Sequence, residues 1–371
     1  MRIYSFNNHY IGTANRKFVK SAIKELKAMC PDVKVIDRFP EGIFTFRINL
    51  HREVFYYRLQ ENPPIFLRHI HPIDRMFFLS KGIFPPDASA RAVTSLSHLI
   101  KPGRKISVQA RRIPGEYDYT LFTFKKKLDP VLANEHYGIP AVKKPDQILS
   151  IYVSDSSAID HTQSATCQLG ECRDGPPTSW EGIVFMGVST PQENLCEWSG
   201  GQVRFAREDR QKSRAEFKLL EAFEVFPIPV EKNGFALDLG ASPGGWSRIL
   251  LQKGFLVTAV DRAPLDHEIQ SEKKLRFVKQ DALHFRDEPD KYHIITNDIN
   301  RDPVQSAQAM TAIAPSLKKN FPFVMTIKLT GKSFEKILEK VKKRLEDVFD
   351  ICGIRQLFHN REEVTIWGVR K

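Results

Sequence analysis

The chain contains 371 residues, which predicts two or three domains of ordinary size. Hydrophobic residues make up 42% and charged residues 27%, values that exclude a disordered or collagen-like chain. No apolar run reaches the roughly 18 residues of a membrane-spanning helix, and the first residues lack the layout of a signal peptide. Five cysteines are too few for a disulfide framework in a chain of this length. We therefore expect a reduced, cytoplasmic protein without membrane contact and without an obligatory protein partner.

The charge balance is strongly basic. Lys and Arg number 56 against 44 Asp and Glu, which leaves a formal net charge of +12. A basic surface suits a polyanion such as nucleic acid, because neutralised phosphates release counterions. Many soluble proteins are basic without such a partner, so charge alone leaves that alternative open.

The first part of the chain combines one helix with short strands. Lys17 to Met29 has the apolar spacing of an amphipathic helix, and Gly42 to Ile48 has that of a strand. A Pro/Gly break then follows at Gly82 to Asp87. We predict an N-terminal α/β module over residues 1–82.

The middle of the chain is rich in strands and in basic residues. Ile106 to Arg111 and Ile148 to Val153 alternate as half-buried strands do. A polar stretch from Thr190 to Arg210 indicates a second boundary, so the middle domain is predicted over residues 83–195. Its basic clusters and nearby aromatic residues suit RNA binding, although solvated strand edges explain them almost as well: Lys101 to Arg112, Lys125 to Lys127, Lys143, Lys144, Tyr117, Tyr119 and Phe122.

The last part, residues 205–371, alternates short apolar strands with helical segments. This order is typical of an α/β fold with a doubly wound, mostly parallel sheet. The predicted strands are Phe235 to Leu239, Phe255 to Val260, Leu275 to Ala282, His293 to Thr296, Phe323 to Ile327 and Glu363 to Val369.

A glycine-rich turn follows the first of these strands. Gly240, Gly244 and Gly245 are spaced Gly-x-x-x-Gly-Gly, which is neither the dinucleotide fingerprint nor a P-loop. Glycines between a strand and a helix let the backbone approach a ligand closely. Ser242 occupies the place of the second glycine of the dinucleotide pattern, so a pyrophosphate fits poorly.

Two acids extend this site along the sheet edge. Asp261 ends the next strand, where an acid can bind ribose hydroxyls, and the third segment, Leu275 to Ala282, brings Asp281 to the same sheet edge. Together these features predict a nucleoside cofactor without phosphates, for which S-adenosylmethionine is the candidate. The predicted cofactor-binding residues are Asp238, Gly240, Ala241, Ser242, Pro243, Gly244, Gly245, Trp246, Asp261, Asp281 and Asp298. Trp246 is expected to pack beside the loop without a chemical role.

The stretch Asp238 to Ser247 resembles the cofactor motif of the FtsJ family of RNA ribose 2′-O-methyltransferases. Ser213 to Leu219 resembles the opening helix of that family, and Asn360 to Ile366 is similar to its last strand. The long extension before residue 205 resembles relatives that carry an N-terminal module and a THUMP RNA-binding domain. The resemblance implies a Rossmann-like methyltransferase domain and an RNA substrate, in particular large-subunit (23S-type) ribosomal RNA.

The resemblance also implies a catalytic tetrad of Lys218, Asp298, Lys328 and Glu363. Methylation of a ribose hydroxyl needs removal of its proton, and we expect Lys328 to act as the general base. Lys218 would favour its neutral form, while Asp298 would orient its amine. Glu363 is expected to position Lys218 or the ribose, with Glu362 as the neighbouring alternative.

Other functions would leave different marks. The segment Asn297 to Arg301 lacks both the Asn/Asp-Pro-Pro-aromatic loop of base amino-group methylation and the cysteine of cytosine methylation. It also departs from the Met-Ala-Pro that often follows the family's aspartate, and Arg301 could contact RNA phosphate or belong to a reshaped loop. The alternatives are a methyltransferase for transfer RNA or a base, and a non-catalytic RNA-binding assembly factor.

A zinc site is the weakest hypothesis. Cys167, Cys172 and Cys196 lie near His161, but the C-x₄-C spacing falls outside the tight pairs of strong zinc signatures. We expect no metal, and free or partly buried thiols instead.

Overall fold

The computed structural model describes residues 1–113, 117–136, 138–155, 180–206, 213–331 and 334–371. The chain forms two compact units, Met1–Gln202 and Val203–Lys371. Each unit is described by itself. The division falls inside the polar stretch 190–210 that composition marked as a boundary. Within the described residues, no helix is long and apolar enough to cross a membrane.

The first unit begins with a four-stranded antiparallel sheet and two helices. The sheet has the strand order β3-β4-β2-β5, and the elements follow one another as β-α-β-β-α-β. That order and topology define a ferredoxin-like module. Its elements are β2 (His9–Ala14), α1 (Val19–Met29), β3 (Lys34–Phe39), β4 (Ile43–Arg47), α2 (Arg52–Glu61) and β5 (Leu67–Pro72).

The helix predicted over Lys17 to Met29 is confirmed as a short 3₁₀ turn at Arg16–Phe18 followed by α1. Asn15 caps the turn by accepting a hydrogen bond from the Lys17 amide. One face of α1 is buried, and its apolar side chains are those that the periodicity selected. The Glu25 carboxylate accepts hydrogen bonds from the Ile65 and Phe66 amides at 3.1 and 3.0 Å, which fixes the helix against the chain entering β5.

A six-stranded sheet forms the rest of the first unit. Its order is β1-β6-β10-β9-β7-β8; β6 and β10 pair antiparallel to their neighbours, and β7 pairs parallel to both β8 and β9. Two of its strands precede residue 82, so the predicted 1–82 module shares strands with the middle domain and both limits stay predictions. The elements are β1 (Ile3–Ser5), β6 (Arg75–Leu79), α3 (Pro85–Ala92), β7 (Lys105–Arg112), α4 (Phe122–His136), β8 (Ile139–Pro140), β9 (Gln147–Asp155) and β10 (Gly182–Ser189).

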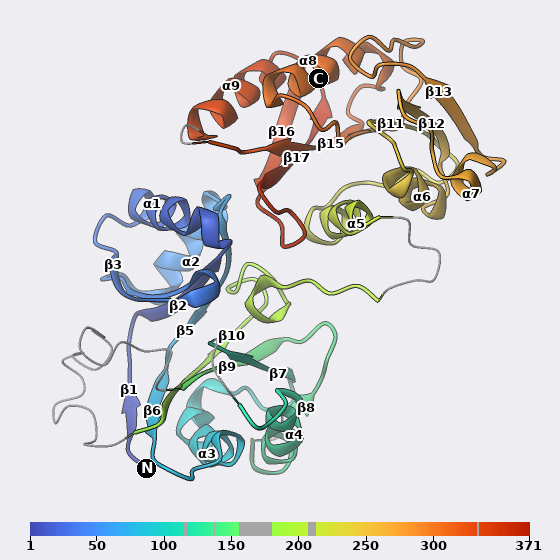
Figure 1. Cartoon of the computed structure of the whole chain (residues 1–371). Helices are drawn as coiled ribbons and strands as arrows, with labels where there is room; N and C mark the ends of the chain where they lie inside the picture. Colours follow the sequence, from blue (N-terminus) through green and yellow to red (C-terminus); the bar gives the residue numbers. More distant parts are fainter. Residues whose placement is uncertain (114–116, 137, 156–179, 207–212, 332–333) are drawn as a thin grey trace. The chain divides into compact units, whose positions relative to one another are not determined.

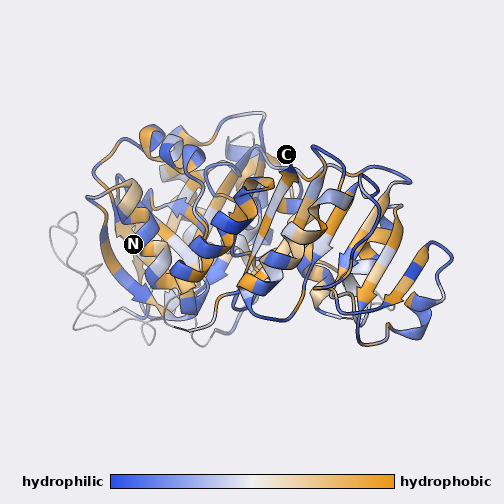
Figure 2. Cartoon of the chain, turned by 90° about the horizontal axis from the view of Figure 1, so that it is seen from above, coloured by the Kyte–Doolittle hydropathy of each residue, from blue (hydrophilic) through white to orange (hydrophobic). Residues whose placement is uncertain are grey.

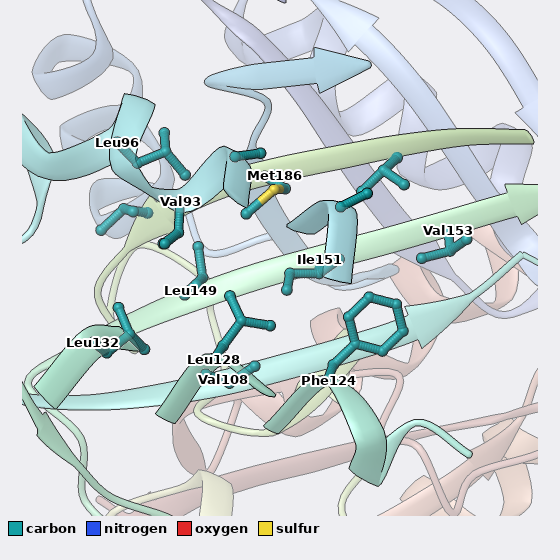
Figure 3. Packing of buried hydrophobic residues seen from close by; sticks show 14 of the residues in the cluster. Val93, Leu96, Val108, Phe124, Leu128, Leu132, Leu149, Ile151, Val153 and Met186 are labelled. Atoms are coloured by element: carbon teal, nitrogen blue, oxygen red, sulfur yellow. The ribbon is translucent and has the colours of Figure 1, made fainter. Parts of the chain in front are cut away.

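The core of this sheet lies between its strands and α4. Figure 3 shows Phe124, Leu128 and Leu132 of the helix pointing toward Leu149 and Ile151 of β9. The predicted half-buried alternation of β9 is wrong, because its polar positions are buried as well. Residues of the other face pack in a second cluster that contains the first strands of the chain, so both faces of β9 are covered.

The segment after β10 packs on the same unit. The Ile70 amide donates to the backbone oxygen of Asn194, whose side chain is fully buried. Arg111 and Thr13 donate to the backbone oxygens of Ser199 and Gly200, at 2.9 and 3.1 Å. This stretch is therefore an ordered loop that joins the two sheets of the first unit.

The second unit is a seven-stranded sheet with helices on both faces (Figure 1). The strand order is β13-β12-β11-β14-β15-β17-β16, and all neighbours are parallel except those of β17. Counted from β11, the first five strands follow the doubly wound order 3-2-1-4-5, so the predicted fold class is confirmed. Figure 2 shows hydrophobic strands beside helices that carry hydrophilic stretches.

The predicted strands of this unit agree with the structure to within one residue at nearly every end, apart from the third, which stops at Lys279 rather than Ala282. Leu237 and Ile295, on adjacent strands, are fully buried, as expected for a parallel sheet covered on both faces. The elements are α5 (Ala215–Val225), β11 (Phe235–Leu239), α6 (Gly245–Gln252), β12 (Leu256–Asp261), α7 (His267–Gln270), β13 (Leu275–Lys279), β14 (Ile294–Asn297), α8 (Pro303–Ile313), β15 (Pro322–Lys328), α9 (Phe334–Glu346), β16 (Phe349–Arg355) and β17 (Glu363–Arg370).

Candidate active site

The glycine-rich turn joins β11 to α6 in a shape that needs glycine. Gly240 has a φ of +77°, and a Cβ there would lie 2.9 Å from the Ile299 Cα atom. Gly244 has a φ of +116° and caps the N-terminus of α6. The turn is held by the Gly240 amide, which donates to the Val260 oxygen at 3.0 Å. A close backbone approach at a helix N-terminus is therefore present where the sequence predicted it.

Asp238 supports this turn from beneath. Its side chain is fully buried, and it accepts hydrogen bonds from the Ser247 and Thr296 hydroxyls at 2.7 and 2.9 Å. Burial raises the pKa of Asp238 to about 6, against the opposing effect of these two hydrogen bonds. Because no part of the carboxylate reaches solvent, its contribution to ligand binding acts through the turn.

Asp261 and Asp281 lie along the carboxyl edge of the sheet. Asp261 accepts hydrogen bonds from the Ser242 and Ala263 amides at 3.0 and 2.9 Å, so it helps to hold the glycine turn. Asp281 accepts from the Leu283 amide at 3.1 Å and forms an ion pair with Arg301 at 3.0 Å. These contacts, the hydrogen bond from Leu283 foremost, hold the pKa of Asp281 below its usual range.

The start of α5 is fixed against the glycine turn. The Glu216 carboxylate accepts from the Ser213 amide at 3.1 Å, just before the helix, whose N-cap is Arg214. The same buried carboxylate pairs with Arg248 of α6 at 2.7 Å. Trp246 is buried and its indole donates to the Ala215 oxygen at 2.8 Å, which agrees with the packing role expected for it.

Three of the four predicted catalytic residues meet in one ionic cluster. The Lys218 ammonium lies 3.2 Å from Asp298 and 3.4 Å from Glu363. Thr326 of β15 also donates to Asp298, and burial raises the pKa of Asp298 although Lys218 opposes the shift. Glu363, rather than Glu362, faces the cluster.

Lys328, the fourth predicted residue, lies at the same edge but contacts a different group. It is the direct cross-strand neighbour of Glu363 in the β15–β17 pair. Among the described residues its ammonium donates to the side-chain oxygen of Asn300, whereas Asp298 pairs with Lys218. The expectation that Asp298 would orient the Lys328 amine is therefore wrong for this structure, because the shorter reach from α5 gives that carboxylate to Lys218.

A buried acid on α5 aligns the elements of this cluster. Glu221 accepts hydrogen bonds from the Phe358 and His359 amides at 2.7 and 2.8 Å. Because Lys218 lies one turn earlier on α5, this contact places it beside the start of β17 and hence beside Glu363.

Sequence reasoning missed the roles of residues 299–301 and of Thr326. Asn300 and Arg301 contact Lys328 and Asp281, so the loop after Asp298 joins the predicted base to the predicted cofactor acid. The departure from the family pattern was the available signal. Neither contact follows from spacing, since each joins residues 20 or more positions apart.

Of the four residues in the zinc hypothesis, the structure describes one. Cys167, Cys172 and His161 lie outside the described residues, and Cys196 is half-buried. Across the described part of the chain, no group of three or more His, Cys, Asp or Glu side chains could hold a metal ion.

Comparison with known families assigns a class to the second unit. Residues 211–360 match the model of the FtsJ-like methyltransferase family. The matched range contains the glycine turn, Lys218, Asp298 and Lys328. The second unit is therefore similar to FtsJ-like methyltransferases over these residues.

Individual relatives are similar over about half of the chain. Ribosomal RNA large subunit methyltransferase M of Laribacter hongkongensis is 30% identical over 50% of this chain and 56% of its own length. The protein of the same name from Saccharophagus degradans is 34% identical over 47% of this chain and 53% of its own length. The alignments thus span about half the length of these curated relatives.

Among solved structures, TrmN from Thermus thermophilus is similar along its whole length. The match covers 98% of this chain and 100% of that chain, with 16% identity and a TM-score of 0.38. This score is too low to define a shared arrangement, so the fold rests on the strand order described above.

Proposed function

We propose that this chain is an S-adenosylmethionine-dependent RNA methyltransferase that methylates a ribose 2′-hydroxyl, with large-subunit ribosomal RNA as its substrate. The observation that carries the proposal is the meeting of Lys218, Asp298 and Glu363 next to Lys328, at the sheet edge that also bears the glycine turn. The FtsJ-like domain and the named relatives support the reaction class and the RNA substrate.

The residues at the glycine turn fit a nucleoside cofactor. Gly240 and Gly244 shape the turn at the helix N-terminus with positive φ values, while Asp261 and Asp281 supply carboxylates along the same edge. Bound S-adenosylmethionine supplies an electrophilic methyl group. The chain offers no lysine followed by Ser or Thr in this turn, which a triphosphate site would require.

Lys328 is proposed as the general base that takes the proton of the attacking hydroxyl. Its amine must be neutral to do so. Asn300 is an uncharged acceptor, so it orients the amine without the preference for the ammonium form that a carboxylate would impose. Lys218 stays paired with Asp298 and Glu363.

The first unit is proposed to hold the RNA. Its predicted parts are an N-terminal module and a THUMP-like domain. The basic clusters at residues 101–112, 125–127 and 143–144 lie in the second of these parts. A cytoplasmic location and the absence of a membrane partner are part of the same proposal.

The experiment that tests this function is a comparison of Lys328→Ala with the unchanged chain. We expect the variant to bind S-adenosylmethionine with nearly the same Kd in calorimetry and to lose methyl transfer to ribosomal RNA by at least about 100-fold. Normal turnover by the variant would refute the assignment of the base. If the unchanged chain binds the cofactor and RNA but transfers no methyl group, an RNA-binding assembly role is correct instead.

A further inference from the structure

A line of lysines follows the exposed side of α1 in the first unit. Lys20, Lys24 and Lys27 are all exposed, and they are spaced at i, i+4 and i+7. At about 100° per residue these positions fall within a sector of about 60° on one face of the helix. Their α-carbons span about 10 Å along the helix axis. We call these three residues the α1 stripe.

The α1 stripe is not neutralised by its own helix. Glu25 is the one acidic residue of α1, and both of its carboxylate oxygens accept backbone hydrogen bonds from Ile65 and Phe66. None of the three lysines forms an ion pair with another described residue. An ordinary solvated helix face mixes charges of both signs, because neighbouring pairs then stabilise the helix.

Helix α9 shows that ordinary pattern and serves as the comparison. Lys336, Lys340 and Lys343 have the same spacing, but exposed Glu335 and Glu339 alternate with them. The two helices therefore carry three lysines in the same geometry and the same overall charge of +2. They differ in that exposed glutamates lie among the lysines of α9, whereas Glu25 of α1 is half-buried.

A polar cavity continues the positive surface just after α1. Only residues 30–33 separate the end of the helix from Lys34, the first residue of β3 (Figure 1). Lys34 lies directly opposite Arg47 in the β3–β4 pair, and both side chains are exposed. Like charges in this position repel each other and destabilise the sheet.

The cavity has the groups that an anion needs. It measures about 400 Å³, and the residues that line it include Lys34, Arg47, Asn7, Asn8, Ile48 and Asn49. Asp32 also lies at its wall, but its carboxylate already accepts the Asn49 amide at 2.6 Å. An anion seated between Lys34 and Arg47 would relieve their repulsion, and amide groups would complete its hydrogen bonds.

We propose that the α1 stripe and the Lys34–Arg47 cavity together bind the phosphate backbone of the RNA substrate, with one phosphate group in the cavity. This inference rests on the proposed function, since it names the surface that holds the RNA. It assigns RNA contact to the ferredoxin-like module, outside the basic clusters of the middle region.

The test compares two variants of the full chain with a matched control. Lys20→Gln/Lys24→Gln/Lys27→Gln removes the stripe, Lys34→Gln/Arg47→Gln removes the cavity charges, and Lys336→Gln/Lys340→Gln/Lys343→Gln makes the same charge change on α9. The affinity for a ribosomal RNA fragment is measured between 0.05 and 0.3 M KCl. These are solvent-exposed positions, and thermal unfolding of each variant verifies that the fold is kept.

The expected result is a change in salt dependence. Each lost phosphate contact lowers the slope of log K against log salt by about 0.7–0.9, so the stripe variant should lose about 2 to 3 and the cavity variant, which loses one phosphate, about 1. The stripe variant should bind about 100-fold more weakly at 0.1 M salt. The α9 variant should lose less than about 1 in slope.

Slopes equal to that of the α9 control would overturn the inference while leaving the enzyme intact. The proposed function fails in a different way, because the unchanged chain would then bind no RNA or transfer no methyl group. Competition by inorganic phosphate gives a second measurement of the cavity. Phosphate should compete more weakly for the cavity variant than for the unchanged chain, and equal competition would remove the cavity from the proposal.

Discussion

Replacement of Lys218 by methionine tests the ionic cluster most sharply. The Lys218 ammonium lies 3.2 Å from Asp298 and 3.4 Å from Glu363, and the three side chains are only 11–19% exposed. At an effective dielectric constant of about 20, unit charges at this distance attract by about 5 kcal/mol per pair. Much of that is offset by desolvation of the ions. Loss of one partner from such a cluster typically costs about 3–5 kcal/mol, and we expect about 3 kcal/mol here at pH 8.

The loss should depend on pH with a definite sign. Burial already raises the pKa of Asp298, and without Lys218 that pKa rises further. When folding raises the pKa of a carboxyl, that carboxyl stabilises the fold at pH values below its unfolded pKa. This stabilisation is lost as the pH rises through the pKa of the folded state. The variant should therefore be destabilised less at pH 5 than at pH 8, because the Asp298 carboxyl can be protonated.

The assay is urea unfolding of both proteins at pH 5, 6, 7 and 8. Lys291→Met is the matched control, because Lys291 pairs at 3.0 Å with the single carboxylate of Asp287, which also accepts a hydrogen bond from Tyr292. We expect the control to lose about 1 kcal/mol or less. Equal losses for Lys218→Met at pH 5 and pH 8 would refute the electrostatic account of the cluster.

Three further predictions concern the turn and the loop. In the unchanged chain the free energy of unfolding should fall between pH 4 and pH 8 as the Asp238 carboxyl, whose pKa is raised to about 6, ionises. Asp238→Asn should reduce that fall by up to about 3 kcal/mol. An unchanged pH dependence in urea titrations would contradict this. Gly240→Ala should destabilise the protein and weaken cofactor binding more than Gly254→Ala. Both glycines have positive φ, but of the two only Gly240 would place a Cβ against backbone. Equal losses of stability and of cofactor affinity in calorimetry would disprove the clash. Asn300→Asp should move the rising limb of the pH–kcat profile up by about one unit, since a carboxylate beside Lys328 favours the ammonium, and an unmoved limb would show that Asn300 does not orient the base.

The catalytic half of the molecule could be predicted because its signals are local. The strand ends and the glycine turn are each set by residues within a few positions of one another. Parallel strands gather their carboxyl ends at one edge of the sheet. Asp298 and Lys328, each at the end of a strand, are therefore expected at the same edge.

The partners of individual charged groups could not be predicted in the same way. Asp298 was assigned to Lys328, but the position of α5 gives it to Lys218, and that position depends on the contact of Glu221 with residues 358 and 359. In the first unit, β9 was expected to expose one face. The burial of its second face depends on chain segments distant in the sequence, since Tyr152 of β9 packs against His71 of β5 and in one cluster with Ile11 of β2.

The most direct test of the central claim is the position of the transferred methyl group. The purified chain is incubated with radiolabelled S-adenosylmethionine and ribosomal RNA from cells that lack this protein, and the product is digested to nucleosides. We predict label on a ribose 2′-oxygen, and none after incubation with Lys328→Ala. Label on a base would contradict the proposed role of Lys218, Asp298, Lys328 and Glu363, even though the cofactor assignment would stand.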